Sequence, residues 1–196
     1  MTNHLRIATA LLILTHIMII ASLLSASALY GIPVSPVENR LVLSPNKNWS
    51  VSVQNNKENI PMLTLRREPS GKSQELLYVQ GSGWVSWAPD SSGFAFTDAV
   101  FANHYFIHLC GVNDSGGHCR DISSKLEQRI KARLSRETEI DKIYSKALKW
   151  LSPTTLLVGI HVVTNPKMKP GQTYAPVYYS FEAFVVAGER VVLSRS

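Results

Sequence analysis

Side chains that can act as acids, bases, nucleophiles or metal ligands gather between residues 104 and 119. His104 and His108 lie four residues apart in an apolar run typical of a strand, so both should lie on one face. Such a pair could serve a hydrolase or a glycan-binding surface, although strand histidines more often face solvent or a satisfied partner. The chain lacks a G-x-S-x-G elbow, an H-E-x-x-H motif and a glycine-rich phosphate loop. We therefore expect no catalytic residue, no cofactor and no metal.

The two cysteines enclose a short turn-forming segment. Cys110 and Cys119 are separated by eight residues rich in glycine, asparagine and aspartate. In an oxidising compartment this spacing predicts a disulfide across a hairpin, which stabilises the fold by roughly 2–3 kcal/mol. The alternative is a metal site in which His108 and His118 join the two thiolates, but strands do not arrange these groups as a tetrahedron in advance.

The N-terminus has the form of an export signal. A short basic start that includes Arg6 precedes an almost wholly apolar run from Ile7 to Leu24, and the small residues Ala26-Ser27-Ala28 follow. This pattern predicts a signal peptide over residues 1–28 and an exported protein, periplasmic or secreted if the source is bacterial. The apolar run is nearly long enough to cross a bilayer, so an uncleaved N-terminal anchor that contacts the membrane is the alternative.

Composition limits what the remainder can be. Of the 196 residues, 45% are hydrophobic and 17% are charged, so a packed core is expected over a single domain spanning 29–196. The formal net charge of +6 is a mild excess and does not favour nucleic acid as a partner.

A proline-centred turn between two strands occurs three times. The clearest copy runs from Trp84 to Thr97 (WVSWAPDSSGFAFT), and weaker copies surround Pro45 and Pro153. Each copy begins a series of short alternating strands, which predicts three units of four antiparallel strands. Tryptophans lie in or beside these turns and should pack between units, or else form an aromatic platform for a ligand: Trp49, Trp84, Trp87 and Trp150.

Residues 84–97 resemble the W-S-P-D-G-x-x-I-A-F motif of TolB-like, WD40-like propeller repeats. Val112–Gly117 is similar to the D-x-x-G-G turn of the same repeats, whereas Ser91 replaces their usual glycine and the third copy lacks the aspartate. The resemblance implies propeller blades. Three blades cannot close a ring, so we expect an open array of four-stranded units, with an antiparallel β-sandwich as the alternative. Asp90 should serve the turn rather than catalysis.

One helical insertion is expected at 123–150. Ser124 and Glu127 form a capping box, and apolar residues then recur at helical spacing as far as Leu148, which predicts one kinked helix or two short ones. The insertion is basic and could cover an open sheet edge, dock a protein or contact an anionic surface. With the two histidines, its arginines make up the candidate binding surface: His104, His108, Arg129, Arg133 and Arg136.

The expected function follows from these features together. An exported, disulfide-containing β protein without catalytic motifs is expected to be a non-catalytic protein-binding module, either an envelope accessory factor or an inhibitor. Its partner is another protein or a second copy of the chain, paired through open sheet edges. The alternatives are a hydrolase or glycan-binding protein that uses the histidine and aromatic surface, and a membrane-anchored structural protein.

Overall fold

The computed structural model of the protein describes residues 31–100, 104–134, 138–166, 175–186 and 190–194. The predicted signal peptide, residues 1–28, and Arg136 lie outside these ranges. The described chain consists of strands and one helix, as the sequence predicted. The elements are β1 (Ile32–Val34), β2 (Val42–Leu43), β3 (Trp49–Asn55), β4 (Pro61–Arg67), β5 (Ser73–Tyr78), β6 (Ser82–Trp87), β7 (Gly93–Val100), β8 (His104–Asn113), β9 (Gly116–Asp121), α2 (Ser123–Arg133), β10 (Thr138–Ser152), β11 (Thr155–Pro166), β12 (Val177–Val186) and β13 (Arg190–Leu193).

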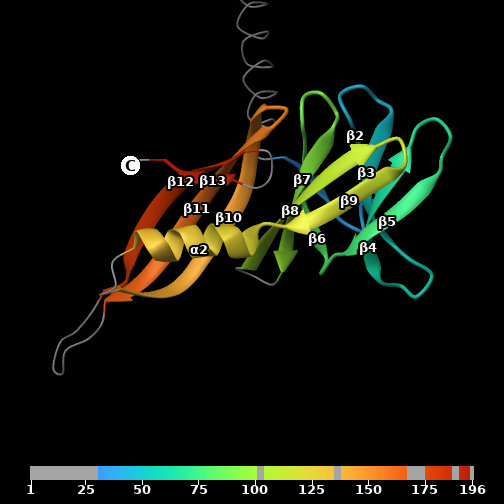
Figure 1. The fold of residues 1–196 in the computed structure, drawn as a ribbon. Coiled ribbons are helices and arrows are strands. Elements are labelled where there is room, and N and C mark those ends of the chain that lie inside the picture. Colours follow the sequence, from blue (N-terminus) through green and yellow to red (C-terminus); the bar gives the residue numbers. More distant parts are fainter. Residues whose placement is uncertain (1–30, 101–103, 135–137, 167–174, 187–189, 195–196) are drawn as a thin grey trace, which may run out of the picture.

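The strands form three antiparallel sheets that lie side by side, and none of them closes on itself (Figure 1). The first sheet has the order β2-β3-β4-β5, the middle sheet β1-β6-β7-β8-β9, and the last sheet β10-β11-β12-β13. The predicted open array of four-stranded units is confirmed. Its one addition is β1, which pairs Ile32 with Val85 and so extends the middle sheet at the β6 edge.

The middle sheet is buried on both faces. Along β7, Phe94 and Phe96 belong to the core shared with the first sheet, whereas Ala95 belongs to the core shared with the last sheet and α2. Successive side chains of a strand point to opposite faces, so a strand covered on both sides needs an unbroken apolar run. This requirement explains why Gly93–Val100 lacks the polar alternation seen in the outer sheets.

Tryptophan side chains join each sheet to the preceding one. The indole N–H of Trp87 donates a hydrogen bond to the carbonyl of Val42 in the first sheet, at 3.1 Å. The indole N–H of Trp150 donates in the same way to the carbonyl of Ser86 in the middle sheet, at 2.9 Å. Both tryptophans lie just before a proline turn, so the recurrence noted in the sequence corresponds to a recurring contact between sheets.

The turn after β6 explains the serine that replaces glycine. Ser91 has a φ of +65°, a conformation that usually favours glycine. Its hydroxyl accepts the backbone N–H of Asn46 at 3.0 Å, and Asn46 lies in the corresponding turn of the first sheet. Asp90 accepts hydrogen bonds from the N–H and hydroxyl of Ser92, at 3.0 and 2.7 Å, which hold the pKa of its carboxyl below the usual value. Asp90 therefore has the structural role predicted for it.

The helical insertion predicted for 123–150 is only partly correct. The helix covers Ser123–Arg133, and Thr138–Ser152 is the long first strand of the last sheet. Pairing with β11 satisfies the backbone groups of this segment, with register shifts between Ile140 and Lys142 and between Ala147 and Lys149, so tertiary pairing overrides the helical spacing. The predicted capping box is also wrong. The helix begins one residue before Ser124, and Asp121 accepts the N–H of Ser123 at 2.8 Å.

Helix α2 covers part of the core between the middle and last sheets (Figure 1). Leu126 and Ile130 are buried there against residues such as Ile107 and Val162, whereas the remaining face of the helix is charged and exposed. Among the described residues, no helix is long and apolar enough to span a membrane.

The tryptophan contacts give the first testable prediction. Replacing Trp150 with Phe keeps most of the ring but leaves the Ser86 carbonyl without its indole donor, which should lower the free energy of unfolding by about 1–2 kcal/mol. Trp87→Phe should lower the free energy of unfolding by a similar amount, because it removes the donor to the Val42 carbonyl. Trp49→Phe is the matched control, because the Trp49 indole N–H makes no hydrogen bond to a described residue. Urea unfolding monitored by circular dichroism provides the measurement, and an equal loss in the control would contradict the assignment.

Candidate functional site

The last sheet has one face in the core and one face open. Val158, Ile160 and Val162 of β11 point into the core, so the residues between them point outward. Neighbouring strands place outward side chains in cross-strand rows: Tyr144 lies opposite His161, which lies opposite Ser180, and Lys142 lies opposite Val163, which lies opposite Tyr178. We call these rows the outer face of the last sheet.

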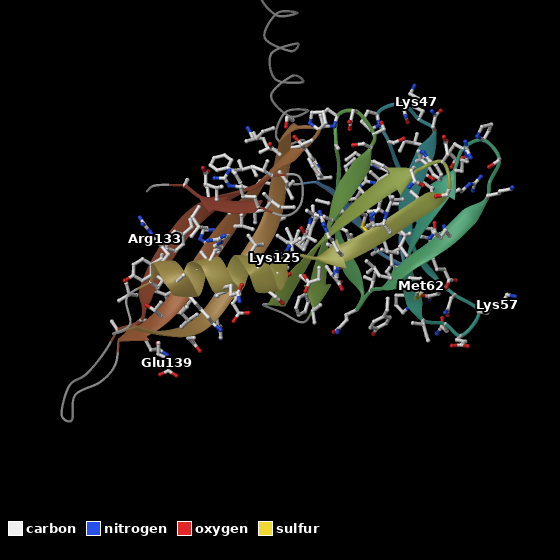
Figure 2. All side chains as sticks on the ribbon, viewed as in Figure 1. Lys47, Lys57, Met62, Lys125, Arg133 and Glu139 are labelled. Atoms are coloured by element: carbon white, nitrogen blue, oxygen red, sulfur yellow. A yellow bond between two sulfur atoms is a disulfide. The ribbon has the colours of Figure 1, made fainter. Side chains whose placement is uncertain are left out.

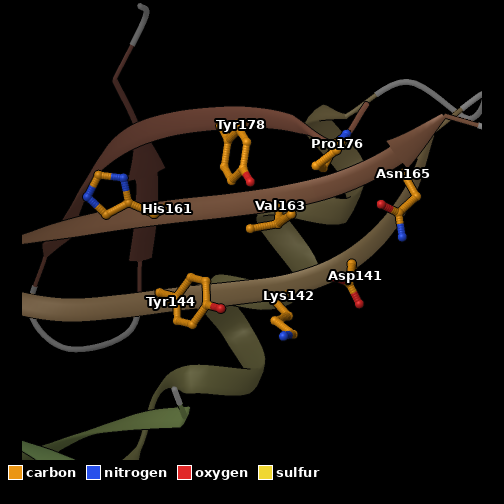
Figure 3. A pocket seen from close by; sticks show the side chains of 8 residues that line it. All are labelled: Asp141, Lys142, Tyr144, His161, Val163, Asn165, Pro176 and Tyr178. Carbon is orange, nitrogen blue, oxygen red and sulfur yellow. The ribbon is translucent and has the colours of Figure 1, made fainter. Parts of the chain in front are cut away.

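A shallow pocket of about 460 Å³ lies on this outer face (Figure 3). Tyr144 and Tyr178 contribute aromatic rings, and Tyr178 is 73% exposed. Charged and amide groups surround them: Asp141, Lys142, His161 and Asn165. The pocket therefore offers apolar rings with hydrogen-bond donors and acceptors at their margin, the arrangement typical of a recognition surface.

Among the described residues, the histidine of this face has one hydrogen-bonded partner. His161 Nδ1 lies 3.0 Å from the hydroxyl of Ser180, and both residues are exposed. A serine nucleophile also needs a base that a third group orients, and donors for the developing oxyanion. No described carboxylate bonds to His161, and Ser180 lies on a flat strand. The contact with Ser180 orients the imidazole on the surface.

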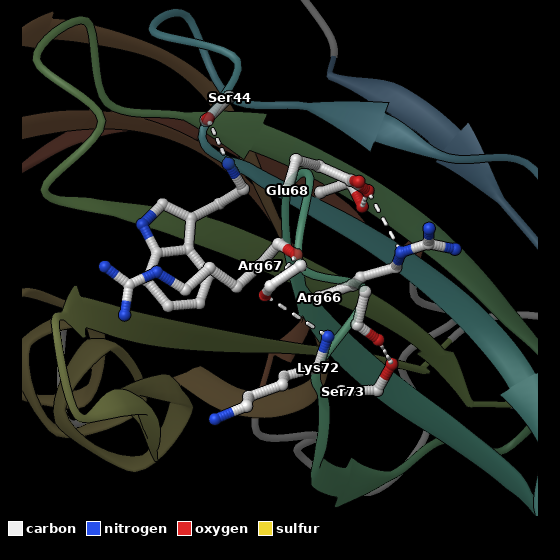
Figure 4. A network of polar contacts seen from close by, with 10 residues as sticks. Ser44, Arg66, Arg67, Glu68, Lys72 and Ser73 are labelled. Atoms are coloured by element: carbon white, nitrogen blue, oxygen red, sulfur yellow. Dashed lines mark hydrogen bonds and ion pairs between the residues drawn. The ribbon is translucent and has the colours of Figure 1, made fainter.

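The first sheet forms the other end of the array, and its outer face satisfies its own charges (Figure 4). Arg66 Nε lies 3.2 Å from Glu68 Oε1, which also accepts the hydroxyl of Ser50 at 2.9 Å. Ser50 and Ser52 are almost completely buried on this face beneath longer neighbours. Glu68 thus already pairs with Arg66 and Ser50, whereas the pocket around Tyr144 and Tyr178 on the last sheet presents exposed rings.

His108 does not belong to this outer face. It lies on the side of the middle sheet that faces the first sheet, and its ring stacks on Phe96 with centroids 6.3 Å apart. Burial lowers the pKa of His108, and Asp121 directly across the strand opposes that effect. His104 begins β8, but its side chain lies outside the described part of the chain.

The arginines of the candidate surface lie elsewhere. Arg129 and Arg133 are exposed on α2, which packs on the opposite face of the middle sheet from His108; Figure 2 labels Lys125 and Arg133 at either end of the helix. The structure therefore does not bring His108 together with these arginines. Tyr144 and Lys142 were not predicted as site residues because their segment was assigned to a helix.

The predicted disulfide is confirmed. Cys110 and Cys119 face each other on β8 and β9 and are bonded, with their Cα atoms 4.0 Å apart. Neither sulfur is then available as a thiolate, which removes the alternative metal site with His108 and His118. The described residues contain no group of three or more histidine, cysteine, aspartate or glutamate side chains that could hold a metal. The disulfide indicates an oxidising environment.

Asp98 is a buried acid that the sequence analysis did not single out. Its side chain on β7 is 4% exposed, and its Oδ1 has no hydrogen-bond partner among the described residues. Burial raises its pKa from 3.8 to about 6, against the opposing effect of a hydrogen bond from the Gln80 backbone. At neutral pH the folded protein therefore carries a poorly solvated negative charge, which costs stability.

Comparisons with protein-family models, with curated proteins and with solved structures found no match to this chain.

The raised pKa of Asp98 predicts a pH-dependent stability. Protonation of Asp98 should stabilise the folded state, because the folded protein holds this proton more tightly than the unfolded chain does. This stabilisation should be fully present below pH 3.8 and lost as the pH rises through about 6. Asp98→Asn should therefore raise the free energy of unfolding by roughly 1–2 kcal/mol at about pH 7.5 and much less at about pH 4. Asp114→Asn, at a carboxylate that is 99% exposed, is the control. A constant difference between wild type and Asp98→Asn across this range would refute the prediction.

Proposed function

We propose that the chain is an exported, non-catalytic binding module that recognises a protein partner through the outer face of the last sheet. The observation that carries the proposal is the pocket between Tyr144, Tyr178 and His161 on a sheet face that no described element covers. Exposed tyrosines that are held on a rigid sheet lose little side-chain freedom on binding, which makes them effective anchors.

Two further observations support this proposal. The Cys110–Cys119 disulfide agrees with the apolar leader in the sequence and favours an exported protein. The array of sheets is open, so no further described sheet packs on the outer face of the last sheet, and this face is accessible to a partner. We infer that the three sheets are related to TolB-like propeller blades; the recurring proline turns and tryptophan–carbonyl contacts support that relation.

A glycan is the second candidate ligand. Tyrosine rings beside Asp141 and Asn165 match the apolar faces and hydroxyl groups of a sugar, and the shallow pocket would admit a chain end or a branch. This candidate would be favoured over a protein partner if the chain bound soluble glycans and captured no protein. Tyr144→Ala should then weaken glycan binding.

Partner capture with matched variants tests the proposal. The purified chain should recover one stoichiometric protein from envelope extract of its source, and Tyr144→Ala should weaken that binding roughly tenfold or more. Tyr78→Ala is the control, because Tyr78 is an exposed tyrosine of the first sheet, 55% accessible to solvent. Circular dichroism and reaction with thiol reagents verify that each variant is folded and oxidised. Failure to recover a stoichiometric protein, or equal weakening by Tyr78→Ala, would overturn the proposal.

A further inference from the structure

The last sheet ends in an edge that is only half paired. β13 pairs with Ala183–Val186 of β12, and the N–H of Ser194 donates to the carbonyl of Glu182 at 2.8 Å. The preceding segment, Val177–Phe181, pairs with β11 on one side and with no described strand on the other. We call this segment the free edge. Val177 is 40% exposed and Tyr178 is 73% exposed.

The direction of the backbone groups along the free edge follows from these contacts. The carbonyl of Glu182 points toward β13, and alternate residues of a strand direct their N–H and C=O groups to the same side. Tyr178 and Ser180 therefore direct their N–H and C=O groups away from β11. In agreement, the carbonyl of Val177 points the other way and accepts the hydroxyl of Thr164 on β11 at 3.2 Å.

Three other edge strands of the described sheets, β1, β9 and β10, carry a feature that limits pairing. β1 carries Pro33, which removes a donor. On β9, Gly117 exchanges two hydrogen bonds of 2.9 Å with the side chain of Gln74 in the first sheet. The N–H of Ala147 on β10 donates to the Thr97 hydroxyl of the middle sheet at 3.2 Å. The free edge has neither a proline nor a charged residue to prevent pairing.

We propose that a second copy of this chain pairs with the free edge across a twofold axis, as an antiparallel strand with Tyr179 opposite itself. In this register Tyr178 of each copy lies opposite Ser180 of the other, which brings their outward N–H and C=O groups together. The large Tyr178 side chain meets the small Ser180 side chain on the outer face. On the core side, Tyr179 would meet Tyr179 of the second copy, and Phe181, whose ring stacks on Tyr179 with centroids 6.3 Å apart, would meet Val177.

Charge favours a second copy at this edge over the surfaces of α2 and β9. With a net charge of +6, copies that meet through α2 or β9 would bring cationic side chains such as Arg129 and Arg120 together. Val177–Phe181 contains no charged residue, so self-pairing there brings no like charges into contact. A strand of five residues buries little surface, so the dimer should be weak and depend on concentration.

This inference goes beyond the proposed function, since it requires no other protein. Sedimentation velocity of the purified chain should show the mass rising from one copy toward two between roughly 10 and 300 µM. Ser180→Pro should remain a monomer throughout, because the proline removes an N–H that points away from β11 and leaves the pairing with β11 intact. Ser180→Ala is the matched control: it loses the same hydroxyl contact with His161 but keeps the N–H, so it should still dimerise. A monomeric wild type, or a dimeric Ser180→Pro, would overturn the inference.

A cysteine cross-link tests the register and does not depend on the folding of the proline variant. The only two cysteines of the chain are bonded to each other, so a new cysteine supplies the single free thiol. Tyr179→Cys should form a covalent dimer under mild oxidation at least tenfold faster than Tyr78→Cys, which places the thiol on the first sheet. Equal rates would exclude Tyr179 opposite itself. Tyr178 belongs to both the pocket and the free edge, but the two tests change different residues. Tyr144 lies on β10, two strands from this edge, so Tyr144→Ala tests the pocket, whereas Ser180→Pro and Tyr179→Cys test the edge.

Discussion

The middle sheet supplies the surface against which both of its neighbours bury a face of their own. A four-stranded sheet with one apolar face gains stability when that face is removed from water, because hydration of apolar surface is unfavourable. Phe94 and Phe96 provide the contact for the first sheet, and Ala95 with Ile107 provides the contact for the last sheet. Successive side chains of β7 thus enter two different cores, one on each face of the middle sheet. The tryptophan–carbonyl hydrogen bonds fix how the sheets lie against each other. The outer face of the last sheet is open because it lies at the end of this arrangement.

Much of the fold could be predicted from local patterns. The proline turns, the bounds of β12 and β13 and the Cys110–Cys119 bond all depend on neighbours within a hairpin, which the chain encodes locally. Residues 138–150 were assigned wrongly to the helical insertion because Ile140, Tyr144 and Leu148 fit a helix as well as a strand, and only pairing with β11 decides between them. The addition of β1 to β6 could not be predicted either, since a strand of three residues carries almost no periodicity.

The candidate site was harder to predict than the fold. His108 and the arginines of α2 were predicted as a binding surface because of the chemistry of their side chains. Which face of a sheet those residues occupy depends on how sheets stack: His108 lies against the first sheet, while α2 covers the opposite side. The pocket combines Tyr144 and Tyr178, which are more than thirty residues apart in the chain, so no local motif marks it. The burial of Asp98 could not be predicted for a related reason, because it results from packing on both faces of the middle sheet.

The pairing of β1 with β6 has a consequence for the order in which the chain can fold. Ile32 meets Val85, and the whole first sheet lies between them in the sequence. The hairpins of the first sheet close small loops and can form early, whereas β1 must wait until β6 has been made and has paired with β7. Closing that long loop is therefore expected to be among the late steps of folding. A chain interrupted before residue 85 would contain all four strands of the first sheet, whereas β1 would still lack its partner β6.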